Sequence, residues 1–364
     1  MRAASLAGIL PVLIVGMAIC SAPAVSRPTL PFGVRVPRAR AGAPVIVRER
    51  RAYYRRTAAI GLCCTAAAVA VAAVNSHGPW WPTRIILLPE VAAGYCCFRL
   101  ARRKIAAVKY QDEWYAGLRQ TVVADTSWRT DPPRFPVRWL IPALTVIAAT
   151  IAVGALRYPS LPAHIVTDSG HRVSKPAVSA LLVAFQLYVT AQWTGIMLLV
   201  YRSRPDIEAA DPRASTLRYR RFLAAFARAL LIMAALVDTT LLLIALGIWQ
   251  VYRPSGGAQA LAVLPVAAGL AVLATVAARS GQGGSRLNGN VRGLALATGT
   301  DRDDDRLWKA GLFYVNRDDP AIMVSARFGA GWTLNFGNRI AWLIIAGVIA
   351  TPACLAVIGA AAGM

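Results

Sequence analysis

FLAAFARALLIMAALVDTTLLLIALGIW, residues 222–249, is the stretch that decides the fold. Only two of its 28 residues carry a charged side chain, Arg228 and Asp238. About 20 apolar residues suffice for a helix to cross the hydrocarbon core, because every backbone N–H and C=O group in lipid must be bonded within the helix. The stretch therefore predicts a transmembrane helix.

Seven further stretches meet the same test. Together the predicted spans are 4–25, 57–76, 82–99, 139–156, 177–201, 222–249, 258–278 and 340–362. The composition agrees, since 57% of the residues are hydrophobic, only 16% are charged and the mean hydropathy is +0.50. We therefore predict an all-α integral membrane protein with eight transmembrane helices.

The basic residues predict the orientation of these helices. Of the 40 lysines and arginines, 33 fall in four alternate connections, 27–56, 99–138, 202–221 and 279–339. Basic loops resist translocation, so these connections are predicted to be cytoplasmic, with the N-terminus and the C-terminus outside. The cytoplasmic connections then account for the formal charge of +23. Nucleic-acid binding is not indicated, because it would need a basic surface on a soluble domain. Arg outnumbers Lys 36 to 4, which indicates a GC-rich bacterial genome and hence the bacterial inner (plasma) membrane.

The first span has an alternative interpretation. Arg2, the apolar run and Ala22-Pro23-Ala24 together are typical of a secretory signal with a small-residue cleavage site. Cleavage would leave the nine arginines of 27–56 outside the membrane, against the charge rule. We therefore favour an uncleaved first span.

Three ionisable residues fall inside predicted spans, and each is a candidate functional residue because a charge in the bilayer is costly. Arg228 is long enough to reach the cytoplasmic headgroups. Asp238 lies mid-span, next to Thr239 and Thr240, and is either a neutral acid bonded to a neighbouring helix or a proton or ligand site. Glu90 follows Pro89, and it either lines a pocket at a proline kink or reaches the outer interface.

No pattern in the chain predicts a cofactor, a metal or a catalytic group. All six cysteines lie in apolar stretches, and their spacing is not that of a zinc site or of a disulfide framework. The pairs Cys63-Cys64 and Cys96-Cys97 are interpreted as small buried hydrophobes, because adjacent helical residues point about 100° apart. His77, His164 and His171 stand in polar connections.

Three connections have a character of their own. Residues 100–123 place apolar side chains on one helical face, at spacings of three, four and seven, and most basic side chains elsewhere, which predicts a helix lying on anionic lipid of the inner leaflet. The glycine-rich run 281–290 predicts a flexible linker. Three β-prone runs, Leu312 to Val315, Ala321 to Ala326 and Trp332 to Phe336, predict a small cytoplasmic β element before the last helix.

These features divide the chain into six parts. They are 1–56, the first span and a basic loop with PFGVRVP; 57–138, the second and third spans and the interfacial helix; 139–201, the fourth and fifth spans with an extracytoplasmic segment at 157–175; 202–278, the sixth and seventh spans; 279–339, the linker and β element; and 340–364, the last span.

The β element resembles a short C-terminal domain of unknown function found in multi-pass bacterial membrane proteins. The matching residues are Trp308, Gly311, Phe313, Tyr314, Asn316, Asp318, Asp319, Pro320, Val324, Arg327, Phe328, Gly329, Gly331, Trp332, Thr333, Leu334 and Asn335. Proteins of this kind commonly carry a PFGVR-like motif after a first span, as do Pro31, Phe32, Gly33, Val34 and Arg35 here. They also carry an extracytoplasmic Leu-Pro, His, Gly and Lys segment shared with SdpI-type proteins, which confer immunity to a secreted toxin. Leu161-Pro162, His164, Gly170 and Lys175 stand in that order here.

The resemblance implies a non-enzymatic protein that binds a peptide or a membrane-protein partner, in an immunity-like or envelope-signalling role. The alternative is a proton-coupled secondary transporter in which Glu90 and Asp238 carry protons and Arg228 steadies an anionic substrate.

Overall fold

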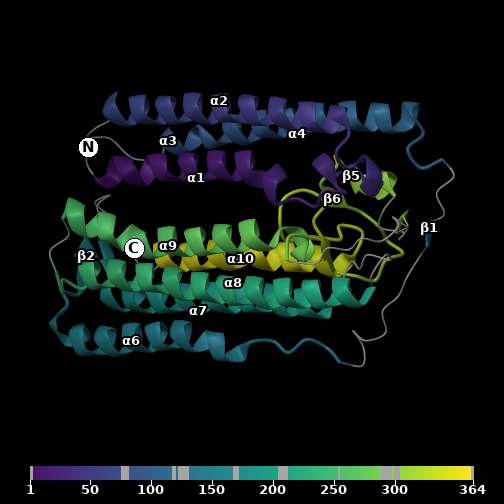
Figure 1. Ribbon diagram of the computed structural model, residues 1–364. Coiled ribbons are helices and arrows are strands. Elements are labelled where there is room, and N and C mark those ends of the chain that lie inside the picture. The colour runs from purple at the N-terminus through teal and green to yellow at the C-terminus, as the bar shows by residue number, and fades with distance from the viewer. Residues whose placement is uncertain are drawn as a thin grey trace. The chain divides into compact units, whose positions relative to one another are not determined.

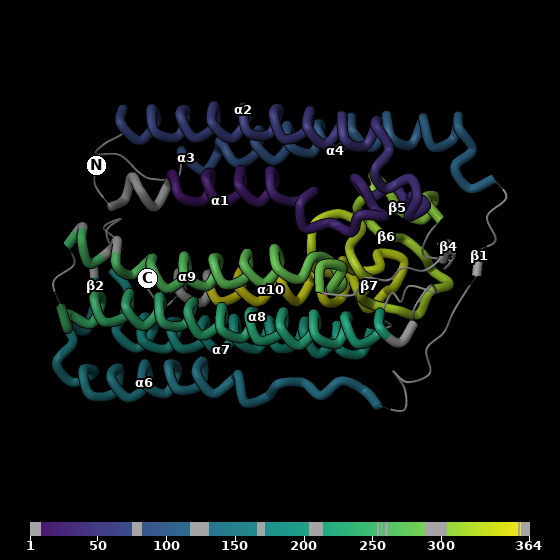
Figure 2. Tube along the Cα trace, viewed as in Figure 1, coloured from purple at the N-terminus to yellow at the C-terminus, as the bar shows by residue number. Residues whose placement is uncertain are grey.

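The computed structural model describes residues 3–74, 82–116, 120–121, 131–166, 172–203, 212–252, 255–287, 297–298 and 304–361 (Figure 1). Arg2, His77, Gly170, His171 and the end of the glycine-rich run at 288–290 lie outside these residues. The described chain is mostly helical, and its strands are short. Figure 2 follows the same path as a Cα tube.

The helices match the apolar runs of the sequence. They are α1 Ala3–Val25, α2 Pro44–Val74, α3 Pro82–Ile85, α4 Leu87–Gln111, α6 Ile141–Arg157, α7 Lys175–Arg202, α8 Pro212–Ile248, α9 Gly256–Ser280 and α10 Arg339–Ala361. Short 3₁₀ turns lie between or beside them, at Pro31–Gly33, Arg38–Arg40, Val137–Leu140, Tyr158–Ser160, Gln282–Gly284 and Asp305–Leu307.

Five helical segments are long and apolar enough to cross a membrane, which makes the chain a membrane protein by length and composition. They are Pro44–Val74, Val137–Ser160, Lys175–Arg202, Ala214–Ile248 and Leu261–Gly284. Two shorter apolar helices, Ile9–Val25 and Arg339–Leu355, coincide with the first and last predicted spans.

The third predicted span, 82–99, differs from the expected single helix. The chain forms the short α3, turns at Ile86 and then begins α4 at Leu87. Pro89 explains the interruption, because its ring has no N–H group and would clash with the carbonyl four residues earlier in a continuous helix.

The predicted interfacial helix over 100–123 is wrong in its bounds, because α4 continues without a break from the third span to Gln111. Two residues of its expected apolar face are buried inside the protein, and 117–119 and 122–123 lie outside the described residues. Ala101 and Ile105 are buried against Phe32, Val34 and other side chains of the chain itself. The protein supplies the apolar surface that the sequence pattern attributed to the membrane.

The chain divides into two compact units. The first contains Met1–Pro133, Ser203–Leu223 and Ala277–Asn338; the second contains Arg134–Arg202, Ala224–Val276 and Arg339–Met364. In the first unit α1, α2 and α4 pack against one another (Figure 1). Gly16 and Gly61 allow α1 and α2 to approach, since a Cβ atom on Gly16 would lie 3.5 Å from the Cα atom of Gly61.

In the second unit α7 packs against both α6 and α10. Polar side chains of α7 bond to α8, as described below, and Gly269 of α9 packs against Met233 of α8. At one end of this unit the ring of Trp249 is buried against Gly154, Leu161 and Ala245.

The strands form pairs. They are β1 Gln120–Thr121 with β4 Ala297–Thr298, parallel, and three antiparallel pairs: β2 His164–Val166 with β3 Arg172–Ser174, β5 Trp308–Lys309 with β6 Phe313–Tyr314, and β7 Met323–Ser325 with β8 Trp332–Leu334. A bridge between Tyr314 and Asn335 joins the last two pairs. The predicted β element near the C-terminus is thus confirmed as small hairpins, with one strand, β5, that the sequence did not indicate.

Candidate functional site

In the first unit, the PFG turn and the RFG segment meet although they are almost 300 residues apart. Phe32 is 1% exposed, and its ring lies 5.6 Å from the ring of Phe328 and 5.1 Å from that of Tyr53. Phe98 of α4 completes this aromatic cluster, 4.7 Å from Phe328. The two sequence motifs are therefore one packed structure.

A partly buried ion cluster lies beside these rings, and we call it the Asp305 cluster: Asp305, Arg102, Lys109 and Arg327. The carboxylate of Asp305 accepts a hydrogen bond from Lys109 Nζ at 3.0 Å and one from Arg327 Nη1. Arg102 Nη2 lies 3.8 Å from the same carboxylate. Burial alone would raise the pKa of Asp305, but the charges of Arg327 and Lys109 and their hydrogen bonds hold that pKa below its ordinary value. Asp305 is thus a charged, fully partnered group.

The same arginines fix the PFG turn. Arg327 Nη1 donates to the carbonyl of Gly33 at 3.2 Å, and Arg102 Nη1 donates to that of Phe32 at 3.4 Å. The guanidinium of Arg327 also stacks 4.8 Å from the centre of the Trp308 ring. Gly33 has φ +70°, and a Cβ atom there would lie 3.0 Å from the carbonyl oxygen of Gly311. Glycine is required at this position by both the backbone conformation and the close contact.

Asn335 organises the rest of the C-terminal motif. Its side chain is fully buried and donates to the carbonyls of Asn316, Asp319 and Ala321 at 2.8–3.1 Å. Its Oδ1 atom accepts from the N–H groups of Asn316 and Gly337, each at 3.0 Å. One amide therefore closes the loop between β6 and β7.

The remaining motif residues also have structural partners. Tyr314 is fully buried and donates to Asp319 at 3.1 Å, and Gly329 N–H bonds to Ser26. Trp332 Nε1 donates to Tyr219 at 3.0 Å. Arg35 is half-buried and Pro320 is exposed.

The glycine-rich run is not wholly a flexible linker, as was predicted, because its first part is an ordered turn. The side chain of Gln282 is 2% exposed and donates to the carbonyl of Gly331 at 2.7 Å, while its Oε1 atom accepts from Gly331 N–H at 2.6 Å. Two hydrogen bonds to one residue hold the run against the RFG segment.

In the second unit, Asp238 is the centre of a polar network across α6, α7 and α8. Its side chain is fully buried, and Oδ2 accepts a hydrogen bond from Thr190 at 2.7 Å. Gln186 donates to the main-chain carbonyl of Asp238 at 2.9 Å and to Thr150 at 3.0 Å. Within the described chain, Asp238 Oδ1 and Gln186 Oε1 have no hydrogen-bond partner. Thr239, next to Asp238 in the sequence, donates to the backbone carbonyl of Ala235 at 2.8 Å.

Glu90 lies in the first unit, where α1, α2 and α4 meet. It is 1% exposed, and neither carboxylate oxygen has a hydrogen-bond partner among the residues that are described. A Cβ atom on Gly16 would lie 2.6 Å from Oε1, so the carboxyl sits directly against the α1 backbone. Glu90 and Asp238 belong to different units.

Arg228 and His164 are both exposed. Arg228 Nε donates to the carbonyl of Ala224 at 3.1 Å, so its side chain points back along α8 toward the basic end of the helix. That direction suits the predicted reach to the headgroups, which stays a prediction. His164 begins β2 and pairs in register with Ser174.

Some residues of these sites were not singled out by the sequence. Arg102 and Lys109 were among the basic residues predicted to lie on anionic lipid, and Asp305 was not singled out. In the searched, described residues, no group of three His, Cys, Asp or Glu side chains is arranged to hold a metal ion.

Comparison with known families gives one match. A model described as "Family of unknown function (DUF5808)" matches residues 317–342. These residues contain the β7–β8 hairpin, Arg327, Trp332 and Asn335, so the chain carries a segment similar to that family. The match does not extend to the PFGVR motif or to the segment 157–175. Neither a curated protein nor a solved structure matches the chain.

Proposed function

We propose that the chain is a non-enzymatic, eight-span protein of the bacterial inner membrane that binds a peptide or a membrane-protein partner at its outer face. Both termini lie outside in this proposal. The five long apolar helices, the two shorter ones and the interrupted α3–α4 segment supply the eight crossings. The alternation of basic connections supports the orientation.

Cysteine labelling tests this topology. Arg40 and Ser160 are exposed, and the proposal puts them on opposite sides of the membrane. A membrane-impermeant maleimide is expected to label Ser160→Cys in intact cells and Arg40→Cys only after permeabilisation, in a chain whose natural cysteines are replaced. The reverse pattern would overturn the orientation.

The outer hairpin, β2 and β3, is the observation that carries partner binding. The second unit fixes the base of this hairpin. Leu161 is 6% exposed and packs with Trp249, and Lys175 Nζ donates to the carbonyl of Tyr158 at 3.3 Å. The sheet has only two strands, so each strand has an outer edge with no third strand from the described chain. An extended peptide can add to such an edge through main-chain hydrogen bonds.

The register identifies which backbone groups face that edge. Lys175 N–H bonds to the carbonyl of Ala163 at 3.0 Å, and inward and outward groups alternate in an antiparallel pair. The backbone N–H of His164 therefore faces outward, whereas that of Ile165 faces β3. The side chain of His164, on the same strand as this edge, is exposed.

The immunity version of the proposal is tested by deleting the gene and exposing the cells to secreted toxins of competing strains. Greater sensitivity is expected, and wild-type protein or His164→Ala should restore resistance. His164→Pro should not restore resistance, because proline removes the outward-facing N–H group of this residue. Proline is otherwise tolerated at the first residue of a strand. If the deletion left sensitivity unchanged across a broad panel of toxins, that result would count against the immunity role. If His164→Pro restored full resistance, that result would count against binding at the hairpin edge.

A proton-coupled transporter is the second candidate, and the unpartnered oxygens of Asp238 and Glu90 favour it. A buried carboxyl without a cation costs far less as the neutral acid than as the carboxylate, so each could take up and release a proton. This candidate predicts that Asp238→Asn abolishes accumulation of a solute in membrane vesicles at unchanged protein abundance. Undiminished accumulation would exclude Asp238 from the coupling.

A further inference from the structure

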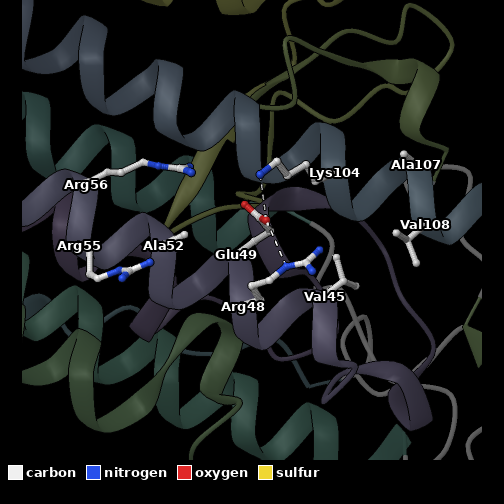
Figure 3. Close-up of a pocket in the computed structure, with 9 residues that line it drawn as sticks. All are labelled: Val45, Arg48, Glu49, Ala52, Arg55, Arg56, Lys104, Ala107 and Val108. Atoms are coloured by element: carbon white, nitrogen blue, oxygen red, sulfur yellow. Dashed lines mark hydrogen bonds and ion pairs between the residues drawn. The ribbon is translucent and has the colours of Figure 1, made fainter.

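A groove of about 520 Å³ lies between α2 and α4 of the first unit (Figure 3). It is lined by Val45, Arg48, Glu49, Ala52, Arg55, Arg56, Lys104, Ala107 and Val108. Four cationic side chains and one carboxylate leave a formal charge of +3 on these residues. The groove therefore suits an anionic ligand.

Glu49 neutralises only one end of the groove. Its carboxylate is 2% exposed and lies 3.1 Å from Lys104 Nζ and 3.7 Å from Arg48 Nε. Figure 3 shows these two cations on either side of it. Arg55 and Arg56 are exposed and form no hydrogen bond or ion pair with any part of the chain that is described. Their guanidinium groups are available to a ligand.

The position of the groove on α2 indicates which ligand. Beyond Arg56, residues 57–74 of α2 carry no charge, as a membrane-spanning segment requires. Arg48 and Arg56 are eight residues apart, about 12 Å along the helix, which brings the groove to the height of the lipid headgroups. In this uncharged part of α2, the side chain of Leu62 is 73% exposed and that of Val69 is 42% exposed.

We propose that this groove binds the phosphate of an anionic phospholipid, with Arg55 and Arg56 on the phosphate and the acyl chains along Leu62 and Val69. Guanidinium groups bind phosphate oxygens through paired, charge-assisted hydrogen bonds. A zwitterionic lipid would add its own cation to a site that already has an excess of them. The proposal does not depend on the outer hairpin or on any protein partner.

Native mass spectrometry of the full chain in a neutral detergent tests the proposal, at physiological ionic strength to screen non-specific attraction. The probes are cardiolipin, phosphatidylglycerol, phosphatidylcholine and inorganic phosphate. The wild-type protein should bind the two anionic lipids in preference to phosphatidylcholine, and inorganic phosphate more weakly than either. Arg55→Gln/Arg56→Gln should weaken cardiolipin binding about twenty-fivefold, since each cation near an anionic surface contributes about fivefold.

Arg51→Gln/Arg103→Gln is the matched control. It removes the same charge from exposed positions of α2 and α4 that do not line the groove. Its affinity for cardiolipin should change less than threefold. Equal losses in both double variants would overturn the site, and inorganic phosphate binding as tightly as lipid would overturn the lipid as its occupant. If the first double variant does not fold, Arg55→Gln and Arg56→Gln alone should each lose about fivefold.

Discussion

Two aspartates, one in each unit, have opposite surroundings: Asp305 is partly buried, with 15% of its side chain exposed, and Asp238 is fully buried. Asp305 of the first unit is surrounded by Arg102, Lys109 and Arg327. Asp238 of the second unit has one hydroxyl on Oδ2, from Thr190, and no partner on Oδ1 among the described residues. The first carboxylate is held charged by three cations, and the second is not paired with a cation in the described chain.

This difference separates a carboxylate that is tied into an ion cluster from a carboxyl that has a single neutral partner among the described residues. Removing a partner from a buried ion cluster leaves other charges without compensation, so the whole cluster depends on Asp305. A carboxyl that has only one neutral partner can change its protonation without disturbing its neighbours. The Asp305 cluster is of the first kind, and Asp238 is of the second.

The largest effect is expected for Asp305→Asn. The substitution keeps the shape of the side chain but leaves three cations around a neutral group, so the free energy of unfolding should fall by about 3–5 kcal/mol. Thermal unfolding in detergent, followed by tryptophan fluorescence, measures it. Asp318→Asn removes the same charge from an exposed site and should change it by less than about 0.5 kcal/mol. Equal effects would contradict the structural role of the cluster.

Acid should reproduce the first effect without a mutation. The pKa of Asp305 is lowered in the folded chain, so its contribution is fully present above the unfolded-state pKa of about 3.9. It is lost as pH falls through the folded-state pKa, because the unfolded chain binds the proton first. The gap in melting temperature between wild type and Asp305→Asn should therefore narrow below about pH 4. A gap that stays constant to the lowest accessible pH would show that Asp305 does not titrate in this way.

A smaller effect is expected from Gly33→Ala. Its φ of +70° is unfavourable for a side chain, and the new Cβ atom would lie 3.1 Å from Arg102 Nη1. The substitution should destabilise the PFG turn by about 1–2 kcal/mol, again measured by thermal unfolding. Gly42→Ala, where a Cβ atom meets nothing within 4 Å, should be neutral to within about 0.5 kcal/mol. If Gly33→Ala left the free energy of unfolding unchanged, the conformation of the PFG turn would not contribute to the stability of the Asp305 cluster.

The smallest effect on stability is expected from Asp238→Asn. The amide oxygen can still accept the hydrogen bond of Thr190, and no cation loses a described partner. The free energy of unfolding should change by less than about 1 kcal/mol in the same assay. A loss as large as that of Asp305→Asn would show that Asp238 is a charged structural residue, and would remove the contrast between the two sites.

Much of the fold could be predicted from hydropathy, because lipid forces each apolar run to satisfy its own backbone. The runs around 57–76, 139–156, 177–201, 222–249 and 258–278 correspond to the five long candidate spans. A kink at Pro89 was one of the alternatives considered for the third predicted span, and the helix breaks at Ile86, three residues before that proline. The fate of 100–111 could not be predicted, since an amphipathic face suits a lipid surface and a protein surface equally well.

Residues of the candidate sites were singled out from the sequence, but the side chains that they contact were not. The motif residues Phe32, Gly33, Gly311 and Arg327 were recognised in separate segments, and nothing in the sequence brought them together. Asp305 could not be chosen among Asp303, Asp304 and Asp305, because only the folded chain brings Lys109 and Arg327 to one of them.

The sequence by itself determined which segments belong in lipid and which polar residues are costly there, because transfer from water to hydrocarbon depends on local composition. The tertiary structure alone decided which carboxyl is paired and which is not. Charge compensation acts over a few ångströms in space, and two of the three cations that supply it for Asp305, Arg102 and Lys109, stand about 200 positions away in the chain.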